Sequence, residues 1–207
     1  ATTFATSNTL FGTAIQPRSR TGQIVTGVAM AFIGSIILTI SAKISVPVWP
    51  VPVTLQTMAV AAIAAALGAR LGTAAVALYI AQGLLGLPVF AGAGAGPAYL
   101  MGPTAGFIVA WLPMAAIIGY AADRGLSRNV FVLAAVMIAA DAVSFLFGFS
   151  WLLALSGQAG WVDQSDLVAS AWRGAVEPFI VWDLVKMAFA ALTIAGGWAL
   201  LSRRTQA

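Results

Sequence analysis

The sequence of 207 residues contains no cysteine and no histidine, and only 8% of its residues are charged. Without cysteine there can be no disulfide and no thiolate metal site, and without histidine the commonest metal ligand and neutral-pH proton carrier is missing. We therefore expect no metal and no cofactor. A soluble domain carries about 25% charged residues, whereas this chain is 61% hydrophobic with a mean hydropathy of +0.97. The composition predicts an integral membrane protein.

Two further absences narrow the function. The ten basic residues are scattered between apolar runs and form no patch, so no nucleic-acid partner is expected. The glycine-rich run at 92–96 lacks the lysine and the strand-to-helix context of a phosphate-binding loop, so the chain is not expected to hydrolyse ATP. An enzyme would need a nucleophile or general base with a partner, and none is evident beyond the pair Asp183 and Lys186. If the protein transports a solute, transport is either downhill or driven by a partner.

Six apolar segments predict an all-α, polytopic membrane fold with six transmembrane helices. They lie at about 22–44, 53–69, 71–90, 104–122, 129–154 and 176–201. A spanning helix needs about 20 residues, so the second segment is marginal. We expect a cytoplasmic arm at 1–21, one six-helix domain at 22–202 and a short tail at 203–207.

The connections between these segments also have a predicted character. The prolines at 47, 50 and 52 exclude helix, and the glycines around 92–96 disfavour it. Residues 68–72 predict a tight helical hairpin with Arg70 at its tip, and residues 155–174 predict a polar loop. Within the fourth segment, Pro113 predicts a kink.

Arginines alternate between the connections. The N-terminal arm, every second loop and the C-terminal tail hold Arg18, Arg20, Arg70, Arg124, Arg128, Arg203 and Arg204. The intervening loops contain Arg173 as their only arginine, with Asp163, Asp166 and Glu177. The positive-inside rule then predicts that both termini are cytoplasmic. The first twenty residues have no apolar core of a signal peptide, so no cleaved signal is expected.

Asp183 and Lys186 lie three residues apart inside the last apolar segment, on one face of a helix. A charge inside the hydrocarbon costs about 2.5–3.5 kcal/mol on insertion scales, so such a pair normally faces a bundle interior or a polar cavity. It either fixes helix packing or forms a polar ligand site, and we favour the ligand site.

Other polar and aromatic residues gather at the same, outer side of the predicted bundle. The candidate pocket residues are Trp49, Gln56, Gln82, Phe90, Tyr99, Trp151 and Trp182. Taken singly, each aromatic residue is more typical of an anchor at the membrane interface than of a ligand contact, whereas each amide could equally bind a substrate or face lipid headgroups. Asp141 lies deeper, in the fifth segment, and we expect a structural or conformational role for it.

Gly27, Ala31 and Ser35 form a stripe of small residues in the first segment. Such a stripe allows close helix approach. It predicts either packing within this chain or docking of a partner helix.

Four motifs in order resemble the BioY family, the biotin-binding S components of energy-coupling-factor (ECF) vitamin transporters. They are residues 51–57 (VPVTLQT), 86–92 (GLPVFAG), 102–107 (GPTAGF) and the pattern Pro178-Phe179-x-x-x-Asp183-x-x-Lys186. The resemblance implies biotin capture in a bacterial cytoplasmic membrane, with a transmembrane T protein and two ABC-type ATPases as partners. It also implies that Gly27, Ala31 and Ser35 dock the T protein. A homo-oligomer is left open. Relatives carry an arginine near the position of Gly94, and this chain does not match it.

The chemistry of biotin suits these residues. Asp183 can accept a hydrogen bond from a ureido N–H, while Lys186 either donates to the ureido carbonyl or pairs with the valerate carboxylate. Gly92 and Gly94 can bring backbone N–H groups to the tail. An S component for another small vitamin and a structural membrane subunit are the alternatives.

Overall fold

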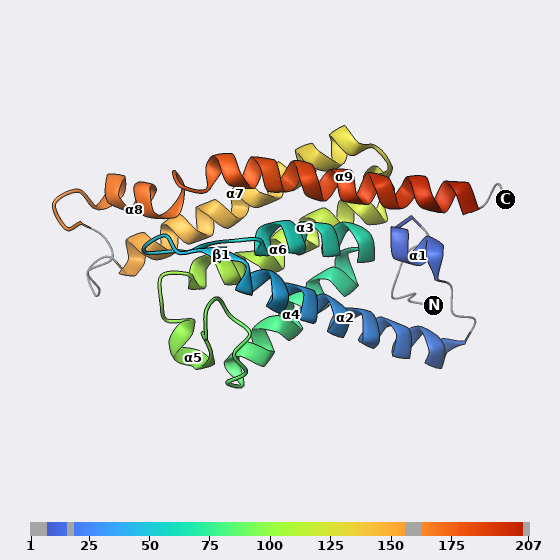
Figure 1. Ribbon diagram of the computed structural model, residues 1–207, viewed down its shortest axis with the longest axis horizontal. Helices are drawn as coiled ribbons and strands as arrows, with labels where there is room; N and C mark the ends of the chain where they lie inside the picture. Colours follow the sequence, from blue (N-terminus) through green and yellow to red (C-terminus); the bar gives the residue numbers. More distant parts are fainter. Residues whose placement is uncertain (1–7, 16–18, 156–162, 205–207) are drawn as a thin grey trace.

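The computed structural model describes residues 8–15, 19–155 and 163–204, which form an elongated helical bundle (Figure 1). Its helices are α1 (Leu10–Ala14), α2 (Arg20–Lys43), α3 (Gln56–Leu67), α4 (Ala69–Leu84), α5 (Gly96–Tyr99), α6 (Ala105–Asp123), the 3-10 turn η1 (Leu126–Arg128), α7 (Val130–Leu155), α8 (Leu167–Ala175) and α9 (Ile180–Arg204). Strands β1 (Ser45–Val46) and β2 (Val53–Thr54) pair antiparallel between α2 and α3.

Each predicted segment contains a helix, but the helices differ in length. Among the described residues, four stretches are long and apolar enough to cross a membrane: Arg20–Lys43, Ala105–Asp123, Val130–Leu155 and the run Leu167–Arg203, which comprises α8 and α9. The helices α3 and α4 have only 12 and 16 residues. The third segment, expected to reach residue 90, ends as a helix at Leu84 because Gly86 has φ +91° and Pro88 follows.

The predicted hairpin between α3 and α4 is confirmed. Gly68 separates the two helices with φ +85°, a conformation that favours glycine. The carboxylate of Asp123, at the end of α6, accepts a hydrogen bond from the backbone N–H of Ala69 at 3.1 Å. Added bulk at Gly68 would collide with that carboxylate, so the turn and the end of α6 fit each other closely.

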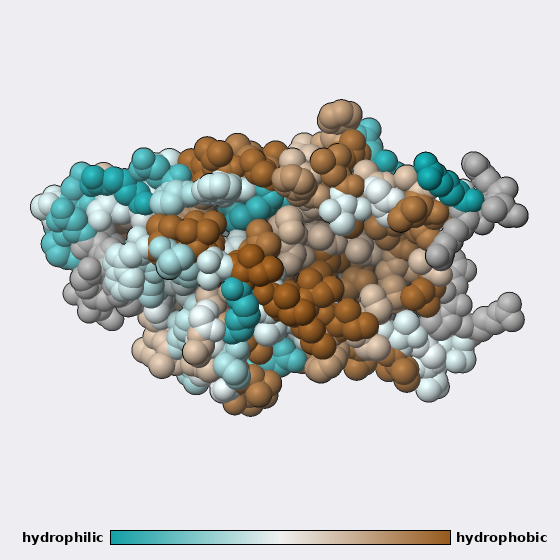
Figure 2. Space-filling model, in the orientation of Figure 1, coloured by the Kyte–Doolittle hydropathy of each residue, from teal (hydrophilic) through white to brown (hydrophobic). Residues whose placement is uncertain are grey.

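The surface suits lipid contact around the middle of the bundle. Apolar residues cover this region over α2 in Figure 2, whereas hydrophilic residues gather toward both ends. On α2, the side chains of Val25, Val28 and Ile40 are 62%, 65% and 57% exposed. The chain is thus a membrane protein with several apolar helices, as its composition predicts.

The small-residue stripe lies on the opposite face of α2. Gly27, Ala31 and Ser35 are all buried within the chain. Their neighbour Gly34 approaches α4 so closely that a Cβ added to it would lie 2.7 Å from the Cβ of Ala75. The structure therefore supports the packing alternative, since docking of a partner on this stripe would require α2 to leave α4.

The prediction of a polar loop at 155–174 is wrong for residues 167–174, which belong to α8. The side chain of Asp166 caps this helix by accepting a hydrogen bond from the N–H of Ala169 at 3.2 Å. Ala171 and Ala175 are fully buried and pack in a cluster with Leu152 and Phe179. The two alanines are one helical turn apart, so they lie on the same face of α8, and this face packs against the bundle.

The N-terminal arm also contributes structure. Within it, α1 packs against α3 and α9, and Phe11 is 9% exposed. The helix α1, the start of α2 and the end of α9 lie at one end of the bundle (Figure 1). The loops that follow α2, α4 and α5 and the helix α8 lie at the other end, where the candidate pocket is found.

Candidate substrate pocket

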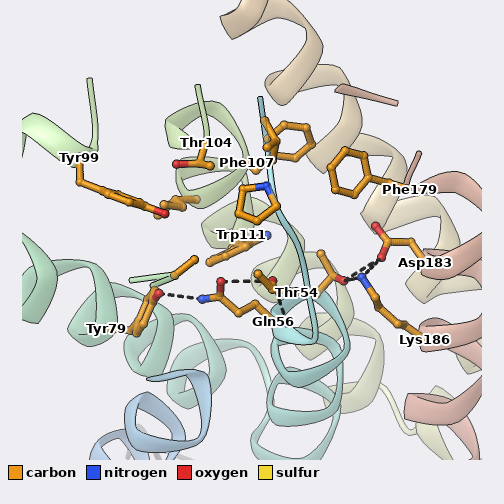
Figure 3. A pocket seen from close by; sticks show the side chains of 15 residues that line it. Thr54, Gln56, Tyr79, Tyr99, Thr104, Phe107, Trp111, Phe179, Asp183 and Lys186 are labelled. Atoms are coloured by element: carbon orange, nitrogen blue, oxygen red, sulfur yellow. Dashed lines mark hydrogen bonds and ion pairs between the residues drawn. The ribbon is translucent and has the colours of Figure 1, made fainter. Parts of the chain in front are cut away.

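A small cavity of about 40 Å³ lies between α3, α4, α6, α9 and the loops beside them (Figure 3). Its wall is formed by Val51, Pro52, Thr54, Gln56, Thr57, Tyr79, Ala91, Tyr99, Thr104, Phe107, Ile108, Trp111, Phe179, Asp183 and Lys186. Of the residues predicted for the pocket, Asp183, Lys186, Gln56 and Tyr99 are brought together here. A ligand pocket usually measures about 300–1,000 Å³, so in this conformation the protein's own side chains nearly fill the site.

Asp183 and Lys186 form one side of the cavity. Lys186 Nζ lies 2.5 Å from Asp183 Oδ1, and the side chains of Lys186 and Asp183 are 8% and 4% exposed. The hydroxyl of Thr57, on α3, donates to the same carboxylate oxygen at 3.0 Å. Asp183 also lies in the first turn of α9, where the positive end of the helix dipole favours an anion. The charges of Asp183 and Lys186 thus neutralise each other, and Thr57 adds a hydrogen bond from a second helix.

Gln56, at the start of α3, forms a second polar group on the opposite side. Its Nε2 donates to the hydroxyl of Tyr79 at 2.7 Å, and this hydroxyl donates to the carbonyl of Val89 at 3.2 Å. Gln56 is 3% exposed and Tyr79 is fully buried. This chain of hydrogen bonds connects α3, α4 and the loop after α4, and it fixes the orientation of the amide.

Aromatic rings form the wall next to Gln56. Phe90 is fully buried and does not reach the cavity, but it stacks on Tyr99 with ring centroids 4.8 Å apart. Phe90 also packs edge-on against Tyr79 at 5.5 Å. Gly94 lies against the ring of Tyr99, where a Cβ would collide with it. Burial raises the pKa of the Tyr99 phenol, so this residue stays neutral and able to donate a hydrogen bond.

Lys43, which the sequence patterns did not single out, holds the loop that carries Phe90. Its ammonium, at the end of α2, donates at 2.7 Å to each of the carbonyl oxygens of Pro88, Phe90 and Gly92. These three bonds use the three protons of the ammonium. No arginine is present in the glycine loop, yet a lysine from α2 brings a cation to its backbone.

The remaining predicted residues lie elsewhere. Trp49 and Trp182 are 74% and 61% exposed and are not part of the cavity wall. Trp151 Nε1 donates to the carbonyl of Gly102 at 2.9 Å, and Trp151 is not part of the cavity wall. Gln82 is half-buried and outside the wall, and Gly92 contributes its carbonyl to Lys43. Their roles in binding stay predictions.

Asp141 is 4% exposed on α7, and within the described ranges its Oδ1 has no hydrogen-bond partner. It lines a separate crevice with Leu184 and Met187 of α9. The structure therefore places Asp141 outside the main cavity. No cluster of metal-ligating side chains occurs in the part of the chain that the structure describes.

Several wall residues were missed by reasoning from charge and periodicity. Thr57, Phe107 and Phe179 lie inside the motifs that carry the family resemblance, so the motifs could have indicated them. Thr104, Phe107 or Ile108, and Trp111 follow helical spacing along α6, which shows one face to the cavity. Tyr79 has no local signal, because its position depends on how α4 packs.

Comparison with known proteins is consistent with this architecture. The model of the BioY family matches residues 12–203. The probable biotin transporter BioY of Pyrococcus horikoshii is 37% identical over 153 residues, covering 74% of this chain and 84% of its own. The biotin transporter BioY of Thermotoga maritima is 34% identical over 167 residues, covering 75% and 86%.

A solved structure supports the fold. The crystal structure of the S-component for biotin from an ECF-type ABC transporter superposes with a TM-score of 0.74, at 24% identity, covering 86% of this chain and 93% of that one. With nearly the whole sequence matched by the family model, the chain belongs to the BioY family.

Proposed function

We propose that this chain captures biotin in the membrane as the substrate-binding S component of an ECF-type transporter. The observation that carries the proposal is the buried cluster of Asp183, Lys186 and Thr57 on the wall of a cavity that is otherwise mostly apolar. Membership of the BioY family and the names of its relatives, which are biotin transporters, support the choice of ligand.

The chemistry of the cluster matches the ureido head of biotin. Asp183 accepts a hydrogen bond from a ureido N–H, and Lys186 donates to the ureido oxygen or to the carboxylate tail. Phe107, Phe179 and Ile108 supply apolar contact for the thiophane ring. Because a cavity of about 40 Å³ cannot hold biotin, the surrounding loops and rings move when the ligand enters. The backbone of Gly92 and Gly94 and the ring of Tyr99 lie in the segment that would have to move.

In the membrane, α2, α3, α4, α6, α7 and α9 form the six-helix domain proposed for residues 22–202. The end that holds Arg70, Arg124, Arg128 and Arg203 faces the cytoplasm, together with both termini, and the pocket opens outward. The membrane is the bacterial cytoplasmic membrane, with its lipids in contact with the apolar faces.

Uptake then depends on partners, a transmembrane T protein and ABC-type ATPases, which supply the energy. This chain is not an enzyme in the proposal, and it releases biotin unchanged. The apolar outer face of α2 is available for a partner helix, whereas the buried stripe at Gly27, Ala31 and Ser35 is not accessible without rearrangement.

A binding titration tests the proposal directly. The purified full chain in detergent or nanodiscs is titrated with biotin and with a panel of other small vitamins. We expect saturable binding of biotin alone, with biotin recovered intact. Saturable binding of a different vitamin would indicate another S component, and binding of none would indicate a structural subunit.

The role of the partners needs a separate measurement. Uptake of labelled biotin is compared in vesicles that contain this chain alone or the chain with T protein and ATPases. We expect ATP-dependent uptake only with the partners. Equal uptake in both preparations would overturn the proposed division of labour without affecting the assignment of the ligand.

A further inference from the structure

The indole N–H of Trp111 is a buried hydrogen-bond donor on the cavity wall that has no acceptor among the described residues. Trp111 is 4% exposed, and Figure 3 shows it beside Gln56 on the cavity wall. Its ring packs against Tyr79 with centroids 6.3 Å apart, so the indole is held in place from one side.

Two other described tryptophans have acceptors for their indole N–H groups. Trp151 donates to the carbonyl of Gly102, and Trp198 donates to the hydroxyl of Ser127 at 3.3 Å. The polar side chains beside Trp111 are engaged as well, because Gln56 bonds Tyr79, and Thr57 and Lys186 bond Asp183. The indole N–H of Trp111 thus lacks an acceptor, whereas the neighbouring polar side chains on the wall have hydrogen-bond partners.

An unsatisfied buried donor is costly, since burial removes its hydrogen bond to water. An indole can only donate, so whatever satisfies it must present an acceptor. A donor left open on the wall of a binding cavity is therefore suited to an acceptor atom that arrives with the ligand.

We propose that Trp111 Nε1 donates a hydrogen bond to the ureido oxygen of bound biotin and is a specificity-determining residue of the pocket. This inference rests on the function proposed above. In this arrangement Trp111 on α6 donates to the ureido oxygen, while Asp183 on α9 accepts from the ureido N–H groups. Side chains from two helices then bind the ureido head together.

Charge favours the ureido oxygen over the carboxylate of biotin as the acceptor. The charged side chains on the wall are one carboxylate and one ammonium, which lie 2.5 Å apart and neutralise each other. A second carboxylate beside Trp111 would leave a net negative charge in this buried space, and burying an unpaired charge is expensive. A neutral carbonyl satisfies the indole without that cost.

The test combines one substitution with three ligands. Trp111→Phe removes the N–H and keeps an aromatic ring, and Trp198→Phe is the matched control at the far end of α9. Each purified variant is titrated with biotin, with the analogue that carries sulfur in place of the ureido oxygen, and with biotin methyl ester. The sulfur analogue weakens the acceptor, whereas the ester removes the charge of the tail.

We expect Trp111→Phe to weaken biotin binding about tenfold, the loss of one buried hydrogen bond. The loss should be much smaller for the sulfur analogue and should stay about tenfold for the ester. Trp198→Phe should match the unsubstituted protein with all three ligands.

Three outcomes would overturn the inference. Equal losses for biotin and the sulfur analogue, or no loss at all, would mean that Trp111 only fills space. A loss that disappears with the ester would assign the donor to the carboxylate instead. If the unsubstituted protein binds no biotin, the proposed function fails, which is a separate result. Thermal unfolding of each variant verifies that the fold is intact.

Discussion

Thr57 on α3 donates a hydrogen bond of 3.0 Å to Asp183 on α9, although the two residues are 126 positions apart in the sequence. Lys186 also approaches the Thr57 hydroxyl, at 3.4 Å. The polar cluster therefore exists only when α3 and α9 are packed together. For that reason, ligand binding reports on the packing of these helices as well as on the chemistry of the side chains.

We expect Asp183→Asn to reduce biotin affinity by orders of magnitude. The change removes the carboxylate that we propose accepts from the ligand and leaves Lys186 as an uncompensated buried charge, and breaking a buried ion pair costs about 3–5 kcal/mol. Lys186→Ala should have a similar effect for the converse reason. Calorimetric titration of correctly inserted protein measures both, and near-native affinity in the two variants would rule out the site.

Thr57→Val should weaken biotin binding by about tenfold or more, because a hydrogen bond to a charged group contributes about 1.5–3 kcal/mol. Valine keeps the shape and removes the hydroxyl that orients Asp183. Thr57→Ser restores the hydroxyl and should recover most of the affinity. If the serine variant binds as weakly as the valine variant, the methyl group of Thr57 matters and the hydrogen bond does not.

Lys43→Met should loosen the loop that follows α4. Three carbonyl oxygens lose their common donor, so the backbone N–H groups of Phe90 and Gly94 should exchange faster with deuterium. Because Lys43 is exposed, we expect only a two- to fivefold decrease in biotin affinity, roughly 1 kcal/mol or less. Lys43→Arg keeps a cationic donor and should be milder. Unchanged exchange at both amides would show that the loop keeps its conformation without Lys43.

Ala31→Trp should destabilise the fold and abolish biotin binding together, because the site is 9% exposed and α2 packs closely on α4. Val28→Trp is the matched control on the lipid-facing side of the same helix, where the native residue is 65% exposed. It should fold and bind normally. Thermal unfolding and titration distinguish the cases. Intact binding with Ala31→Trp, accompanied by loss of T-protein co-purification, would restore the docking hypothesis.

The sequence predicts helix bounds well where a long apolar segment determines the helix. The predicted segments at 104–122 and 129–154 match α6 and α7 within one residue at each end. Prediction failed at α8, where charged and polar residues in 163–173 masked the alanines that pack on the bundle. It also extended α4 too far, because residues 85–90 are mostly apolar although Gly86 and Pro88 end the helix at Leu84.

The residues of the site likewise include some that were predicted and some that were not. Asp183, Lys186 and Gln56 were predicted because charge and amide groups stand out in an apolar chain. Trp111 and Tyr79 were not predicted, because aromatic residues are common in membrane helices and only tertiary packing decides which ring faces a cavity. Lys43 was overlooked since its partners are backbone carbonyls, which any loop offers.

The nearly filled cavity bears on how fast the ligand can arrive and depart. With about 40 Å³ of free space, the protein must rearrange before biotin fits, so collisions alone do not set the rate of association. The same rearrangement must happen again before biotin leaves. A slow opening step therefore lengthens the residence time of bound biotin without adding any contact to it.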